Sequence, residues 1–169
     1  MRVQMVFISV LLLSAMLPGC GSYVPPTVGT AKADIVDSDG TNLGMATLME
    51  TTKGATLNFD ISGLKPGSYS LQVRDKGVCE PPHFDTAGAL METSDEPQAE
   101  PAGNLGDFEV GKDGKASVNR TLTGVSLFGN DHSLLNKSLV ITADSGIGAR
   151  VACGVIKHAK VNPYRYATP

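Results

Sequence analysis

A period-two alternation of apolar and polar residues, repeated four times at short spacing, is the feature that most constrains the fold. Each apolar-polar run is short, and a glycine-containing turn signal separates it from the next. The runs are Ala31–Ile35, Met45–Met49, Leu57–Ile61 and Tyr69–Val73, and the turns are Asp39-Gly40, Lys53-Gly54 and Lys65-Pro66-Gly67. Half-buried strands at such regular spacing predict an all-β protein, an antiparallel barrel or sandwich.

The second half of the chain predicts further strands beyond a long loop. Alternating or continuously apolar runs return at Lys115–Leu122, Lys137–Ala143 and Val151–Ile156. Between them and the first four strands, Glu80–Asp107 has prolines, several acidic residues and little periodicity. We expect a long loop there, and long loops in compact domains often carry function. No stretch predicts a helix of more than a turn or two.

Composition limits the classes of function that this chain can have. At 169 residues it is long enough for one ordinary domain, and 41% of its residues are hydrophobic. The formal net charge is -3, and no basic stripe is present that could neutralise phosphates. We therefore expect no nucleic-acid partner.

The first 20 residues predict a lipoprotein signal peptide. Arg2 gives a short positive region, an apolar segment follows, and Leu17-Pro18-Gly19-Cys20 resembles the bacterial lipobox. Cys20 would then be lipidated and anchor the exported protein to a membrane of the cell envelope. The alternative is an ordinary secretory signal with an incidental cysteine. Residues 21–30 predict a flexible tether and residues 159–169 a C-terminal tail, which leaves residues 31–158 as the domain.

The cysteine count is consistent with export. If Cys20 carries the anchor, Cys79 and Cys153 remain as an even pair in an oxidising compartment. A disulfide between them would stabilise the fold by about 4 kcal/mol in the chain-entropy description. Two cysteines are too few for a zinc cluster.

Two segments resemble the copper/zinc superoxide dismutase family. They are LKPGSYSLQVRDKGVCEPPHFDTAGAL at residues 64–90 and GARVACGVI at residues 148–156. Turns, strand spacing and the cysteine pair extend the resemblance over most of residues 31–158. The resemblance implies an eight-stranded Greek-key β-barrel or sandwich of the copper/zinc superoxide dismutase type.

The same resemblance places non-ligating residues where the family binds its metals. Copper in this family needs histidine nitrogens, and a permanent arginine charge would repel the ion. The copper-ligand positions hold Gln72, Arg74, Leu90 and Thr142, and the zinc-ligand positions hold Leu90, Pro101 and Asn104. We therefore expect no metal, no other cofactor and no catalytic residue.

Two arginines are candidates for contact with an anion or a partner. Arg74 stands at a copper position, and Arg150 stands where the resemblance implies a substrate-guiding arginine. Arg150 has a second interpretation, in which its guanidinium donates to backbone carbonyls near the Cys79–Cys153 bridge. Only Ala143–Ala149 remain of the family's charged loop before the last strand.

Other residues offer weaker alternatives for metal binding. The three histidines would have to converge, Met45 and Met49 would have to share a copper ion as soft ligands, and acidic residues would have to clasp a hard cation. The histidines are His83, His132 and His158, and the acidic residues are Glu92, Asp95, Glu96 and Glu100. Surface histidines, core-filling methionines and a solvated acidic loop are the simpler interpretations.

Taken together, the residues and the resemblance predict an exported lipoprotein that is not an enzyme. Its function would be that of a binding or structural module of the envelope, facing a partner through Glu80–Asp107 and the face of Gln72 and Arg74. A homodimer is compatible with this interpretation. The alternatives are a superoxide dismutase with a rebuilt metal site and a periplasmic copper-binding protein.

Overall fold

The computed structural model describes residues 29–92, 102–129, 132–144 and 148–159. The predicted signal peptide with Cys20, nearly all of the tether and of the C-terminal tail, and Asp95, Glu96, Glu100 and Pro101 lie outside these ranges. Among the described residues, no helix has the length and apolar character needed to cross a membrane.

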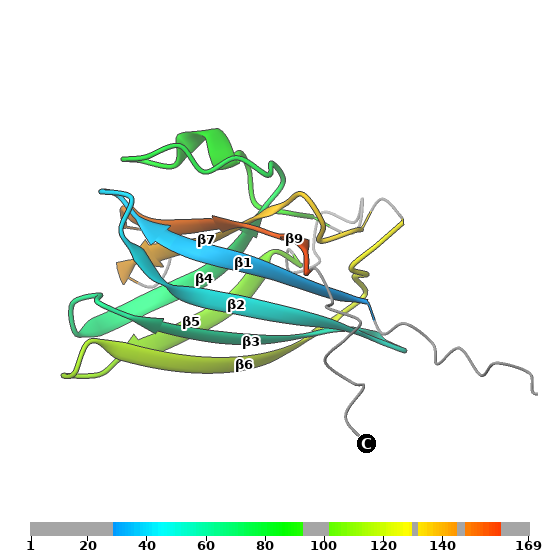
Figure 1. Ribbon diagram of the computed structural model, residues 1–169, viewed down its shortest axis with the longest axis horizontal. Helices are drawn as coiled ribbons and strands as arrows, with labels where there is room; N and C mark the ends of the chain where they lie inside the picture. Colours follow the sequence, from blue (N-terminus) through cyan, green and yellow to red (C-terminus); the bar gives the residue numbers. More distant parts are fainter. Residues whose placement is uncertain (1–28, 93–101, 130–131, 145–147, 160–169) are drawn as a thin grey trace, which may run out of the picture.

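The described residues form an all-β barrel (Figure 1). Its eight main strands make one antiparallel sheet in the order β5-β4-β7-β8-β1-β2-β3-β6, and the short β9 pairs with β1. The strands are β1 (Thr30–Asp37), β2 (Asn42–Thr51), β3 (Gly54–Ser62), β4 (Gly67–Arg74), β5 (Asn104–Val110), β6 (Lys115–Thr123), β7 (Ser138–Ala143), β8 (Arg150–Val155) and β9 (Lys157–His158). The predicted fold class is confirmed: this is an eight-stranded, nearly closed antiparallel barrel.

Alternation explains the core. On β4 the apolar residues Tyr69, Leu71 and Val73 point inward, and the polar residues between them point outward. Phe59 of β3 and Phe108 of β5 meet inside the barrel with ring centroids 5.5 Å apart. The inward residues of the eight main strands thus fill one continuous core.

The prediction of a loop over Glu80–Asp107 is wrong at its C-terminal end. Strand β5 begins at Asn104 and pairs with β4 from Gly67↔Val110 to Gln72↔Asn104. A register shift between Ser70 and Gln72 blurs the alternation that marks the other strands. Gly103 explains the close approach at this point, because a Cβ atom there would lie 2.4 Å from the Val73 carbonyl oxygen.

The barrel has one seam, between β5 and β6, which are the two ends of the strand order. Arg120 of β6 reaches across it. Its Nε donates to the Leu105 carbonyl at 3.0 Å and its Nη2 to the Asp107 carbonyl at 2.9 Å. One side chain therefore satisfies edge carbonyls of β5 that no strand pairs with here.

Candidate functional site

The outer face of β4, β7 and β8 is polar and yet buried. In the described part of the chain, the buried polar side chains all lie on β4 and β7 and point away from the core; they are Ser70, Gln72, Ser138 and Thr142. Buried polar groups need partners, since each unpaired group costs free energy. This face therefore carries the buried polar side chains of the described residues, and each of them needs a hydrogen-bond partner there.

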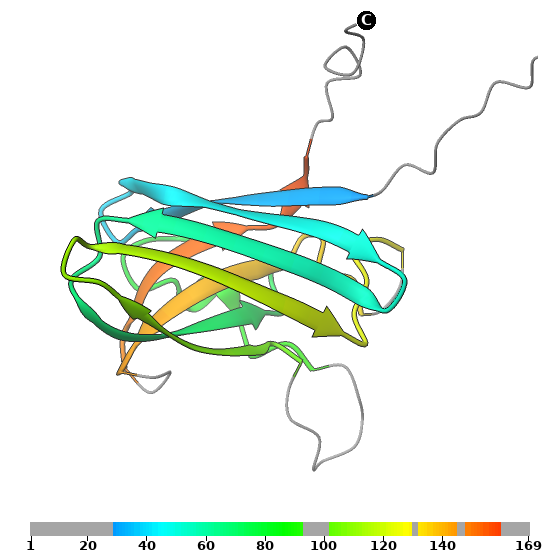
Figure 2. The ribbon, with the colours of Figure 1, turned by 90° about the horizontal axis from the view of Figure 1, so that it is seen from below.

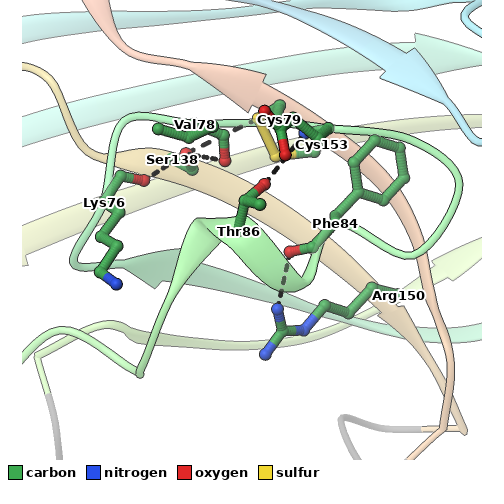
Figure 3. Close-up of a disulfide and its surroundings, with 9 residues drawn as sticks. Lys76, Val78, Cys79, Phe84, Thr86, Ser138, Arg150 and Cys153 are labelled. Atoms are coloured by element: carbon green, nitrogen blue, oxygen red, sulfur yellow. Dashed lines mark hydrogen bonds between the residues drawn. A yellow bond between two sulfur atoms is a disulfide. The ribbon is translucent and has the colours of Figure 1, made fainter.

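The segment of residues 75–91, named the disulfide loop here, covers this face (Figure 3). Cys79 bonds to Cys153 of β8 with their Cα atoms 5.7 Å apart. Phe84 is fully buried and packs with Val140 and Cys153 in a second, smaller apolar cluster. The Ser138 hydroxyl donates to the Lys76 carbonyl at 2.6 Å. A covalent bond, an apolar anchor and a buried hydrogen bond thus hold the loop.

Arg150 joins the loop to β8. Its Nη1 donates to the Phe84 carbonyl at 2.7 Å (Figure 3). Its Nη2 donates to the Gly88 carbonyl at 3.4 Å. The Asp85 carboxylate lies 3.9 Å away but is largely exposed, so that pair contributes little. The guanidinium of Arg150 is therefore engaged with backbone carbonyls near the disulfide, as its second interpretation expected.

The residues that the resemblance places at copper-ligand positions contact one another. The Oε1 atom of Gln72 accepts a hydrogen bond from Arg74 Nη2 at 2.5 Å and lies 3.5 Å from the Thr142 hydroxyl. Leu90 lies beside Arg74, since the two form an isolated antiparallel bridge. The fold thus brings together four positions that the sequence spreads over 70 residues, and builds a hydrogen-bonded cluster from three of them.

Arg74 is the unusual member of this cluster. Its Nε atom is buried and has no hydrogen-bond partner in the described part of the chain. Burial lowers the pKa of the Arg74 guanidinium, the positive charge of Arg150 lowers it further, and Asp75 partly opposes both effects. Two cationic groups therefore lie close enough on this face to act on each other.

These residues do not fit copper. Arg74 is a permanent cation, Leu90 has no donor atom, and the Gln72 oxygen already accepts from the guanidinium. Zinc fares no better, because Asn104 is an exposed amide whose Oδ1 accepts from the Gly106 amide at 3.2 Å. The described residues contain no group of three or more His, Cys, Asp or Glu placed to hold a metal ion.

The alternative ligands lie apart. His83 is exposed in the disulfide loop, His132 lies in the connection between β6 and β7, and His158 of β9 stacks on Phe128 with centroids 4.6 Å apart. Met45 and Met49 do share the outer face of β2, but they are four positions apart along the strand, which is about 13 Å. They therefore form no compact pair of soft ligands. Glu92 is exposed next to the end of the loop.

A shallow hollow occupies the other side of the barrel. It has a volume of about 350 Å³ and is lined by β1, β2 and β3, with Asp34 and Asp60 flanking Met45. It is open to solvent, and its two carboxylates are both exposed. Sequence reasoning missed this hollow, since only the register Asp34↔Met45↔Asp60 places these residues in one row.

The fold and the disulfide-covered face define a class of protein: an antiparallel barrel with its site on the outer face of one half. Similarity to known proteins identifies the class. The family description "Copper/zinc superoxide dismutase (SODC)" matches residues 42–156. A "Superoxide dismutase [Cu-Zn]" of Caulobacter vibrioides is 33% identical over 149 residues, covering 76% of this chain and 86% of that protein. The chain therefore belongs to the copper/zinc superoxide dismutase family.

Other relatives differ in name and in location. An "Extracellular superoxide dismutase [Cu-Zn]" of Haemonchus contortus is 28% identical and covers 68% of this chain and 73% of that protein. A solved "SOD-like protein" from Bacillus subtilis is 26% identical, covering 73% of this chain and 96% of that one with a TM-score of 0.67. The copper/zinc enzyme of Brucella abortus, at 20% identity and a TM-score of 0.62, shares the fold and covers 76% of this chain and 99% of its own.

Proposed function

We propose that this protein is a member of the superoxide dismutase family that has given up metal binding and dismutation and serves as a binding module of the cell envelope. The observation that carries the proposal is the hydrogen bond from the Arg74 guanidinium to Gln72 Oε1, at the positions where the resemblance places a copper-binding histidine pair. A guanidinium occupies the space and supplies the positive charge that a copper ion would bring. The remaining residues at these positions offer no set of nitrogen ligands.

The metal content of the exported protein tests this proposal. The protein is exposed to excess copper and zinc, desalted and analysed by mass spectrometry. We expect well under one metal ion per chain and no dismutase activity above buffer. One tightly held copper per chain would contradict the proposal, and dismutation by that sample would establish the runner-up function that the names of the relatives suggest.

A variant that restores histidine ligands supplies the matched control. Gln72→His, Arg74→His, Leu90→His and Thr142→His together replace the non-ligating residues at the copper positions. Because the backbone already brings these four positions together, we expect the quadruple variant to retain copper in the same desalting procedure. If neither protein retains copper, the loss of binding has causes beyond these side chains.

The location of the protein follows from the disulfide and, for its anchor, from the N-terminal sequence. A disulfide such as Cys79–Cys153 persists in oxidising compartments, so the domain is extracytoplasmic. The proposal places it on an envelope membrane through a lipid on Cys20. Cells that produce the domain from Gly21 behind an ordinary cleavable secretory signal should hold it in the soluble fraction, whereas the full chain should stay in the detergent-extracted membrane fraction. A full chain found in the soluble fraction would contradict the anchor.

A further inference from the structure

The guanidinium groups of Arg74 and Arg150 both lie on the covered face. Among the described residues, no carboxylate forms a salt bridge with Arg74. In the described part of the chain the salt bridges are Lys32–Asp34 and Arg150–Asp85, so Arg74 has no acidic partner within 4 Å. Asp75 acts on Arg74 only from a greater distance. A partly buried cation beside a second cation is costly unless something else balances the charge.

Arg74 also has a hydrogen-bond donor without a partner among the described residues. A guanidinium carries five N–H groups. Among the described residues, Arg74 Nη2 donates to Gln72, and the buried Nε–H has no partner. Gln72 Oε1 accepts from the guanidinium, and the Thr142 hydroxyl of β7 donates to the same oxygen. The cluster therefore fixes the orientation of a guanidinium that keeps an unpaired Nε–H among the described residues.

Arg150 contributes its positive charge to this face, because its donors Nη1 and Nη2 already bond to backbone carbonyls. Two of its N–H groups are committed to the carbonyls of Phe84 and Gly88, which hold the disulfide loop in place. Its positive charge nonetheless acts on Arg74 across the face. Its role at this face is therefore electrostatic and structural together.

We propose that the cluster of Arg74, Gln72 and Thr142, with Arg150 beside it, binds a small free oxyanion of the carboxylate or phosphate type. Planar guanidinium donors match the oxygens of such anions, and an anion there would satisfy the unpaired donor and offset the two like charges. The disulfide loop lies against this face, and Leu90 bridges to Arg74, which favours a compact ligand over a chain segment. This inference rests on the proposed function, because the anion would take the place of copper.

The experiment titrates the exported, full-length protein with inorganic phosphate and, in a second series, with acetate at constant ionic strength. Amide chemical shifts of the isotope-labelled protein give both affinity and place. We expect saturable shifts on β4, the disulfide loop and the start of β8. No saturable shift with either anion overturns the inference, and so do shifts confined to other parts of the barrel.

Two charge-matched variants separate a site from general attraction. Arg74→Gln should weaken binding about tenfold or more, because it removes a charge-assisted donor. Lys157→Gln removes one positive charge from the exposed β9 and should leave affinity unchanged. Equal weakening in both variants overturns the inference, as does full affinity in Arg74→Gln. If Arg74→Gln does not fold, Arg74→Lys replaces it, with a smaller loss expected because the planar donor set is gone.

The metal content of the same samples keeps the two proposals apart. A metal-free protein that binds no anion refutes this inference alone. Stoichiometric copper refutes the proposed function, and the titration is then repeated after chelation. Anion binding that disappears on chelation belongs to the metal and overturns the assignment to Arg74.

Discussion

The two halves of the barrel share one core but differ on their outer faces. Strands β1, β2, β3 and β6 lie side by side in one half of the barrel (Figure 2). Their outward side chains are largely exposed, as for Lys32 and Asp34. On β4, β7 and β8 the outward side chains lie under the disulfide loop and are mostly buried. The same alternation of residues therefore produces a solvated surface on one half and a candidate binding site on the other.

The comparison shows what burial does to a polar side chain. Water satisfies the outward groups of the open half, so their identity matters little to stability. On the covered half each group needs a protein partner, as Ser138 has in the Lys76 carbonyl. Arg74 Nε is the exception there, and such an uncompensated group at a covered face is typical of a functional site.

The largest change in stability is expected when the bond that holds the disulfide loop is removed. The double variant Cys79→Ser, Cys153→Ser should lose about 4 kcal/mol of unfolding free energy, because the bridge closes a long loop in the unfolded chain. Denaturant unfolding measures the loss, and hydrogen exchange should show the disulfide loop opening first. Wild-type protein in reductant is the control. A loss under about 1 kcal/mol would mean that Phe84 and Arg150 hold the loop without the bridge.

The second largest change in unfolding free energy is expected at the seam between β5 and β6. Arg120→Ala removes two hydrogen bonds from a charged donor to carbonyls of β5, and should cost about 2 kcal/mol in thermal or denaturant unfolding. Lys115→Ala on the same strand is the matched control and should be nearly neutral, since Lys115 is exposed. Equal effects of the two variants would show that the seam does not depend on Arg120.

A third substitution should increase the unfolding free energy instead of lowering it, and by a smaller amount. Arg74→Gln should raise the unfolding free energy by up to about 1 kcal/mol, because the unpaired buried donor is removed and the solvent-screened repulsion with Arg150 ends, while the hydrogen bond to Gln72 is lost. Such a gain is expected where function, not stability, retains a residue. Measurement is made in buffer free of carboxylate and phosphate. A clear loss of stability would assign Arg74 a structural role.

The smallest effect belongs to the open face. Lys32→Ala breaks the pair with Asp34, whose atoms lie 3.2 Å apart and whose side chains are both exposed. The change in unfolding free energy should stay within about 0.5 kcal/mol at physiological salt. A larger change would remove the contrast between the two halves.

Much of the site could be predicted from the sequence because it depends on which residues are present. The non-ligating residues Gln72, Arg74, Leu90 and Thr142 are visible in the chain once the family is recognised. Their hydrogen bonds are not, because the Gln72–Thr142 contact spans 70 residues and depends on the register of β4 against β7. The sequence offered the interpretation that Arg150 donates to backbone carbonyls near the bridge, but only the structure identifies these carbonyls as those of Phe84 and Gly88.

The sequence by itself determined the strands that alternate cleanly and the presence of the cysteine pair, and it also shows which residues stand at the positions that the resemblance assigns to metal ligands, since each depends on local period or residue identity. Only the tertiary structure decided that β5 begins at Asn104, where a register shift hides the alternation. It also decided that one outer face is covered and the other open, and that Arg74 and Arg150 act on each other. Burial and like-charge proximity are set by long-range pairing, which period and composition do not encode.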